Sequence, residues 1–163
     1  MDRNLLKKDR MRFVKNKTSA NLCYLAIIFN VLYYVSIYSS DVGNYYYTIL
    51  MGVSVVYNLL FLLTAFLSSE GLKNYKRSYA IVITVIGALQ LVRILGYPMD
   101  ASRAVLSDGN VVMQKSQLVY TVLMLVLSAA SAITAGVVGL IRSYQLESYN
   151  KLSKQMQQKA HNK

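Results

Sequence analysis

Few side chains in this sequence could do chemistry, and the most distinctive is Arg93, which directly follows a long stretch without charge. Gln90 precedes it by three residues, so both side chains share one face of a helix. Together they could offer several hydrogen-bond donors to an anionic group or to a carboxylate of a partner chain. Two alternatives stay open. Asp41 or Asp100 could neutralise the charge from within the chain, or the guanidinium could reach the headgroup region by snorkelling.

Two asparagines form a second pair of candidate residues. Asn30 and Asn58 each lie near the middle of an apolar stretch, at comparable depth if both stretches cross a membrane. Their amides could meet and hold two helices together, at about 0.6–2 kcal/mol per hydrogen bond. They could instead line a narrow polar cavity with Ser54, which lies one helical turn before Asn58. The predicted ligand-binding or partner-binding residues are Asn30, Asn58, Gln90 and Arg93.

The sequence lacks the parts of common catalytic and metal sites. It contains one cysteine, Cys23, and one histidine, His161, and its long apolar stretches contain no Asp, Glu, His or Lys. A metal site needs several converging ligands, and a catalytic triad needs a base. Ion-coupled transporters usually place a carboxylate or a histidine within the membrane. We therefore expect no metal, no cofactor and no enzyme activity.

The elements that position the candidate residues are four stretches without Asp, Glu, Lys or Arg. They cover residues 18–40, 42–69, 78–92 and 116–141. About 20 apolar residues in a helix cross a hydrocarbon core of roughly 30 Å. The sequence therefore predicts an all-α polytopic membrane protein, a four-helix transmembrane bundle that forms a single domain over residues 1–163. The predicted spans are about 20–38, 46–67, 78–97 and 118–142, with a cytoplasmic helix or tail over 143–163.

The third stretch is too short to cross a membrane by itself. The fifteen residues between Arg77 and Arg93 reach only about 22 Å as a helix. A full crossing must therefore carry Arg93 into the membrane, near the outer end of the span. We expect Pro98 to end this helix.

Basic residues are distributed unevenly among the segments outside the predicted spans. Of eighteen Lys and Arg, seven lie in residues 1–17, three in 70–77 and five after 141, whereas the loop 98–117 holds two. Because basic segments are retained in the cytoplasm, both termini are predicted to be cytoplasmic, in a multi-pass protein of the cell membrane. The basic face should attract anionic lipid headgroups rather than nucleic acid, at about 1 kcal/mol per well-placed side chain.

Two further patterns predict contact surfaces. In the loop 98–117, β-branched residues flank an Asp-Gly pair, which is typical of a short β-hairpin at 104–113 and offers an external surface. In the fourth span, small residues recur at helical spacing and would let two helices approach closely, within the chain or between copies. These predicted helix-packing residues are Ser128, Ala132, Gly136 and Gly139.

These observations favour a small non-catalytic membrane protein. The leading hypothesis is a subunit or accessory component of a membrane assembly, which binds other membrane proteins or itself. The alternative is an oligomeric channel or small transporter with a polar pathway around Asn30, Asn58, Gln90 and Arg93. A third possibility is an envelope sensor or lipid organiser that uses the external loop and the basic face.

Overall fold

The computed structural model describes residues 9–38, 45–106 and 109–161, and four long helices dominate it. They are α2 (Lys17–Tyr38), α3 (Tyr45–Lys73), α4 (Arg77–Val92) and α6 (Lys115–His161). The described residues contain no strand. Among these residues, four helical segments, one of them continuing from α4 to Arg103, are long and apolar enough to cross a membrane. This confirms the predicted all-α class with four apolar helices.

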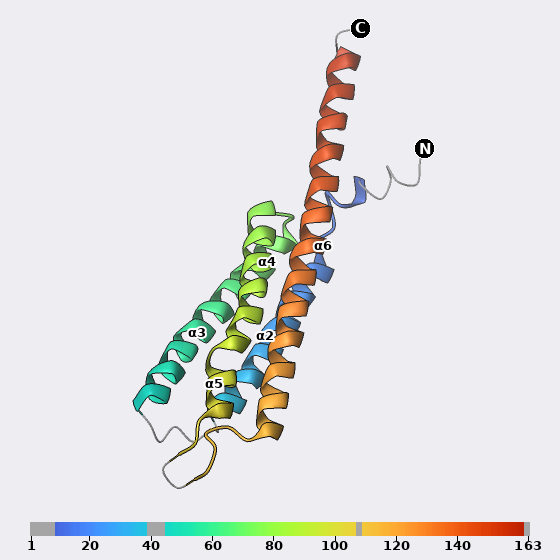
Figure 1. Ribbon diagram of the computed structural model, residues 1–163. Coiled ribbons are helices and arrows are strands. Elements are labelled where there is room, and N and C mark those ends of the chain that lie inside the picture. Colours follow the sequence, from blue (N-terminus) through green and yellow to red (C-terminus); the bar gives the residue numbers. More distant parts are fainter. Residues whose placement is uncertain (1–8, 39–44, 107–108, 162–163) are drawn as a thin grey trace.

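The helices form one elongated bundle in which α6 packs along both α2 and α4. Helix α3 packs against α2 and α4 at the edge of the bundle (Figure 1). The connection between α3 and α4 lies at the same end as the N-terminal segment, and the last third of α6 projects beyond the bundle at that end. The sequence left residues 143–163 as a helix or a tail, and the structure continues the fourth span through them as one helix up to His161.

Small residues bring α6 close to its neighbours. The four residues of the predicted packing stripe, Ser128, Ala132, Gly136 and Gly139, all lie against other helices of the same chain. Ser128 donates a hydrogen bond of 2.9 Å to the backbone oxygen of Ala26 in α2. A Cβ added to Gly136 would lie 2.8 Å from a backbone oxygen of α4. Larger side chains at such positions would push the two helices apart.

In the third span the α-helix tightens into a 3₁₀ turn at Arg93 and is interrupted at Gly96. Helix α4 ends at Val92, a 3₁₀ turn covers Arg93–Leu95, and the short helix α5 (Tyr97–Arg103) follows Gly96. The prediction of one helix that stops at Pro98 is therefore corrected. Pro98 lies in the first turn of α5, where a proline fits because the amide groups of that turn have no partner within the helix. Arg93 therefore lies at the C-terminal end of α4, where the 3₁₀ turn begins.

The structure does not support the predicted hairpin at 104–113. Its described part contains a single antiparallel bridge between Val105 and Val111, and Ser107 and Asp108 of the expected turn lie outside the described residues. Helix α5 occupies the chain up to Arg103, which leaves few residues for a ladder. The side chain of Met113 is buried against the bundle instead. Packing onto the helices therefore determines the course of this segment.

Two apolar clusters fill the bundle, one toward each end. Toward the end with the termini lie Cys23, Ala26, Phe61, Ala65, Leu72, Ala80, Ile83, Ala132 and Ala135. Toward the other end lie Tyr33, Ile37, Tyr97, Ala101, Val112, Met113 and Leu125. Between these clusters, α2, α3 and α4 each contribute polar side chains, and these polar side chains form the candidate site.

Candidate functional site

The guanidinium of Arg93 forms the centre of this polar layer. Its Nη1 atom donates to Asn58 Oδ1 at 2.7 Å and, more weakly, to Gln90 Oε1 at 3.3 Å. Its Nη2 atom donates to the side-chain oxygen of Ser54 at 2.7 Å and to the backbone oxygen of the same residue at 2.9 Å. Three of the four bonds hold the guanidinium against the middle of α3, and the fourth is to Gln90 in α4. We call this cluster, together with Asn30, Tyr33 and Tyr57, the Arg93 site.

The amides of the site are arranged in a definite order. Gln90 accepts from Arg93 through its oxygen and donates through Nε2 to Asn30 Oδ1 at 2.9 Å. Because a guanidinium has only donors, Arg93 sets the orientation of the Gln90 amide, and Gln90 sets that of Asn30. All four side chains predicted from the sequence as binding residues therefore lie in one hydrogen-bonded group that spans α2, α3 and α4.

This order leaves the site with an excess of donors. Within the described residues, Asn30 Nδ2, Asn58 Nδ2 and the hydroxyl of Tyr57 are buried without a hydrogen-bond partner. Both asparagines are almost fully buried, at 0% and 2% exposure. An unpaired buried donor costs about 1–3 kcal/mol. The site is therefore short of acceptors.

Two tyrosine rings cover the faces of the guanidinium. Arg93 Cζ lies 4.4 Å from the ring centroid of Tyr33 and 4.7 Å from that of Tyr57. The hydroxyl of Tyr33 also shares a hydrogen bond of 3.1 Å with Ser54 Oγ. Such cation–π contacts contribute about 2 kcal/mol each when desolvated. The sequence alone did not predict these tyrosines as site residues, although each lies three residues after a polar member of the site, Asn30 or Ser54, on the same helix face.

The positive charge of Arg93 has no carboxylate partner among the described residues. Their ion pairs are Asp9 with Arg12, Glu70 with Lys73 and Glu147 with Lys151. Asp100, one of the two expected neutralising residues, forms no ion pair with Arg93 in the described chain, and Asp41 lies outside it. The described contacts of the guanidinium are therefore with neutral oxygens and aromatic rings. In hydrocarbon, such a charge costs about 2.5–3.5 kcal/mol at the centre of a helix.

A cavity of about 190 Å³ opens next to the guanidinium. Its lining residues are Leu50, Val53, Ser54, Tyr57, Val92, Arg93, Gly96 and Tyr97. Val53 and Val92 on its rim are 63% and 62% exposed, so the cavity opens on the outer surface of the bundle between α3 and the 3₁₀ turn. In a membrane, this surface faces lipid or another transmembrane segment. A small anionic group entering from that side would meet Arg93 and Tyr57, which both line the cavity.

The described residues thus form a helical bundle with four segments long and apolar enough to cross a membrane, and the bundle holds a buried, donor-rich cationic site. No known protein family, no curated protein and no solved structure matches the chain. Its function must therefore be inferred from its own geometry.

Proposed function

We propose that this chain is a small non-catalytic membrane protein that assembles with a partner membrane protein, and that Arg93 binds a carboxylate in a transmembrane segment of the partner. One observation carries the proposal. The guanidinium lies beside a cavity on the lipid-facing surface and contacts only neutral groups of the described chain. A charge held in this way is not neutralised until an anion binds to it.

A carboxylate matches both deficiencies of the site. It carries the missing negative charge, and its two oxygens offer acceptors to a donor-rich cluster. Arg93 and Tyr57 both line the cavity, and the Tyr57 hydroxyl is one of the unpaired donors. A charge-assisted hydrogen bond is shorter and roughly twice as strong as a neutral one. Neutralisation by a partner would therefore favour association within the membrane.

The partner is a different protein rather than a second copy of this chain. The four long apolar stretches contain no Asp or Glu, so a second copy has no carboxylate to offer within the membrane. Its nearest carboxylates are Asp100, which lies in α5 at the far end of the third span, and Asp41 and Asp108, which belong to the segments between spans. A transmembrane helix with a single Asp or Glu meets the requirement, since such residues usually face a protein partner rather than lipid.

The surroundings of the site favour a role in binding a partner over a role as the pathway of a channel or transporter. The polar layer lies between two apolar clusters, so a polar pathway through one chain would have to cross both clusters. The amides within the layer are bonded to each other and to Arg93. These contacts suit a fixed recognition site better than the channel or transporter lining that the sequence also allowed.

We place the termini in the cytoplasm and the protein in the cell membrane. Two observations support this orientation. The described part of the N-terminal segment, the α3–α4 connection and the projecting part of α6 lie at one end of the bundle (Figure 1), and these segments hold eleven of the fourteen Lys and Arg among the described residues. Basic segments are retained on the cytoplasmic side. In this orientation Arg93 lies in the outer half of the membrane.

Photocrosslinking from the rim of the cavity tests the proposal. A photoreactive amino acid at Val53 or Val92 should form an adduct with the partner in living cells, whereas one at Val137 on α6 should not. Arg93→Leu should abolish the adduct at either rim position. The control Arg103→Leu removes the same charge from the end of α5 and should leave the adduct unchanged.

The partner then provides the decisive experiment. After the adduct has been identified by mass spectrometry, its transmembrane Asp or Glu is replaced by Lys, which should abolish assembly. Combining that variant with Arg93→Glu should restore assembly, because the charges are exchanged. An adduct that persists in Arg93→Leu would overturn the proposal. So would a rim adduct that contains only a second copy of this chain.

A further inference from the structure

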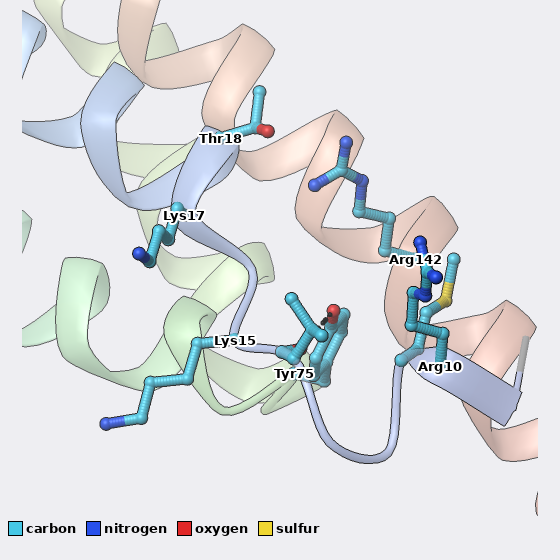
Figure 2. Close-up of a pocket in the computed structure, with 8 residues that line it drawn as sticks. Arg10, Lys15, Lys17, Thr18, Tyr75 and Arg142 are labelled. Atoms are coloured by element: carbon cyan, nitrogen blue, oxygen red, sulfur yellow. Dashed lines mark hydrogen bonds between the residues drawn. The ribbon is translucent and has the colours of Figure 1, made fainter. Parts of the chain in front are cut away.

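A second cavity lies at the end of the bundle that carries the termini. It measures about 360 Å³ and is lined by Arg10, Met11, Val14, Lys15, Lys17, Thr18, Tyr75 and Arg142. Figure 2 shows that these side chains come from the N-terminal segment with the start of α2, from the α3–α4 connection and from α6. We call this cavity the basic pocket. It is separate from the Arg93 site, because no lining residue is shared.

The basic pocket concentrates positive charge. Four of its eight lining residues, Arg10, Lys15, Lys17 and Arg142, are basic, and none is Asp or Glu. None of these four takes part in an ion pair within the described chain. The pocket also lies at the N-terminus of α2, which begins at Lys17, and a helix N-terminus adds positive potential. Its chemistry therefore suits an anion with several oxygens.

Hydrogen bonds between the three segments hold the pocket in shape. The hydroxyl of Tyr75 donates to the backbone oxygen of Val14 at 2.9 Å, which ties the N-terminal segment to the α3–α4 connection. Ser143 Oγ of α6 donates to the backbone oxygen of Tyr75 at 2.9 Å. Arg142 donates to Asn16 Oδ1 through Nη1. The basic side chains thus project from a fixed framework that includes all three walls.

Exposed apolar side chains beside the pocket indicate where the anion comes from. Phe13 is 82% exposed and Val14 50% exposed, although both lie next to a strongly basic segment. Phe13 and similar residues at the end of a transmembrane bundle can enter the boundary between headgroups and acyl chains. A ligand that meets basic and apolar groups side by side is an amphiphile with an anionic head.

We propose that the basic pocket is a binding site for the phosphate of an anionic membrane lipid, with Phe13 against its acyl chains. The proposal specifies one site with defined residues, in contrast to a diffuse attraction of the whole basic face. It does not depend on the partner proposed for Arg93.

Lipid binding by the full-length chain in detergent tests this site. Native mass spectrometry should show one retained phosphatidylglycerol that phosphatidylcholine does not displace. Two variants each remove two charges from the pocket, Lys17→Gln with Arg142→Gln, and Arg10→Gln with Lys15→Gln. Each should weaken phosphatidylglycerol binding by about tenfold or more. The second variant spares Arg142, whose bond to Asn16 contributes to the fold.

The control removes two charges elsewhere. Lys154→Gln with Lys159→Gln lowers the net charge equally on the projecting part of α6, and should change binding by less than about twofold. An equal loss in the control and the pocket variants would show a diffuse attraction and overturn the proposal. Displacement of the lipid by an equal concentration of glycerol 3-phosphate would assign the pocket to a soluble phosphate ester instead. Phe13→Ala should weaken lipid binding, and an unchanged affinity would likewise contradict a lipid ligand.

Discussion

Arg93 Nη1 donates a hydrogen bond of 2.7 Å to Asn58 Oδ1, across 35 residues of sequence, and so joins the turn after α4 to the middle of α3. The amide oxygen holds the guanidinium in place, yet it carries no charge. The geometry of Arg93 is therefore fixed by its own chain, while its charge is left to be balanced by another group. This separation of position from neutralisation is what makes the residue suitable for recognition.

Asn58→Asp should neutralise Arg93 within the chain. The new carboxylate occupies the position of an amide oxygen that already contacts the guanidinium. Hydrogen bonds to charged groups contribute about 1.5–3 kcal/mol, so the midpoint of thermal unfolding in detergent should rise. The rim adduct of Val53 should disappear, because the partner's carboxylate is no longer needed. Asn58→Leu, which removes the acceptor without adding charge, should lower the midpoint. A stabilised Asn58→Asp protein that still forms the adduct would argue against a carboxylate partner.

Two substitutions of Tyr57 can separate the contribution of its ring to stability from that of its hydroxyl. Its ring covers Arg93, but its hydroxyl is buried without a partner in the described residues. Tyr57→Phe should leave thermal stability unchanged or slightly higher, whereas Tyr57→Leu should lower it by about 1–2 kcal/mol through loss of the cation–π contact.

Tyr57→Phe also tests whether the hydroxyl donates a hydrogen bond to the partner's carboxylate. Tyr57→Phe should reduce the yield of the rim adduct even though the fold is intact. Tyr33→Phe is the matched control, because its hydroxyl is already bonded to Ser54 Oγ. It should cost about 1 kcal/mol of stability and leave the adduct in place. Equal adduct yields in both phenylalanine variants would show that the Tyr57 hydroxyl does not contribute to binding of the partner.

Gly136→Ala should separate α6 from α4. An added Cβ would lie 2.0 Å from Thr84 Oγ1 and 2.8 Å from the backbone oxygen of Ala80, and overpacking of this kind costs about 1–3 kcal/mol. Gly52→Ala in α3 is the control, since a Cβ there meets nothing within 4 Å. Thermal unfolding in detergent should show a clear loss for the first variant and none for the second. Similar midpoints would mean that the two helices can move apart freely.

The sequence was sufficient for the class of fold and for the members of the polar layer, and physical reasons explain both. A helix surrounded by hydrocarbon carries no charged side chain on any of its faces. Each apolar stretch can therefore be recognised in the sequence without knowing which helices pack against it. Buried amides and an arginine inside such stretches are equally conspicuous, which is why Asn30, Asn58, Gln90 and Arg93 could be selected. Tyr57 could not, because the ring of a tyrosine can pack as an apolar group inside such a stretch, and only its position over the guanidinium distinguishes it.

Other features depend on tertiary packing that a linear pattern does not contain. The Asp-Gly pair after α5 signals a hairpin locally, but Met113 is buried against the helices and only one bridge forms in the described part. The order of donors from Arg93 through Gln90 to Asn30 depends on the relative rotation of α2 and α4. Pro98 reads as a stop for the third helix, yet the chain restarts as α5 once Gly96 has turned it.

Single cysteines can establish the orientation of the bundle. Cys23 is buried and is the only cysteine, so Cys23→Ser provides a background without reactive thiols. In that background, Val105→Cys places a thiol on a side chain that is 65% exposed at the α5 end. Lys154→Cys places one on the exposed, projecting part of α6.

If the basic segments are retained in the cytoplasm, a membrane-impermeant maleimide should label position 105 in intact cells and position 154 only after permeabilisation. The reverse pattern would invert the bundle and place Arg93 in the inner half of the membrane. The partner's carboxylate would then have to be sought near the cytoplasmic end of its span, so this labelling should precede the search for the partner.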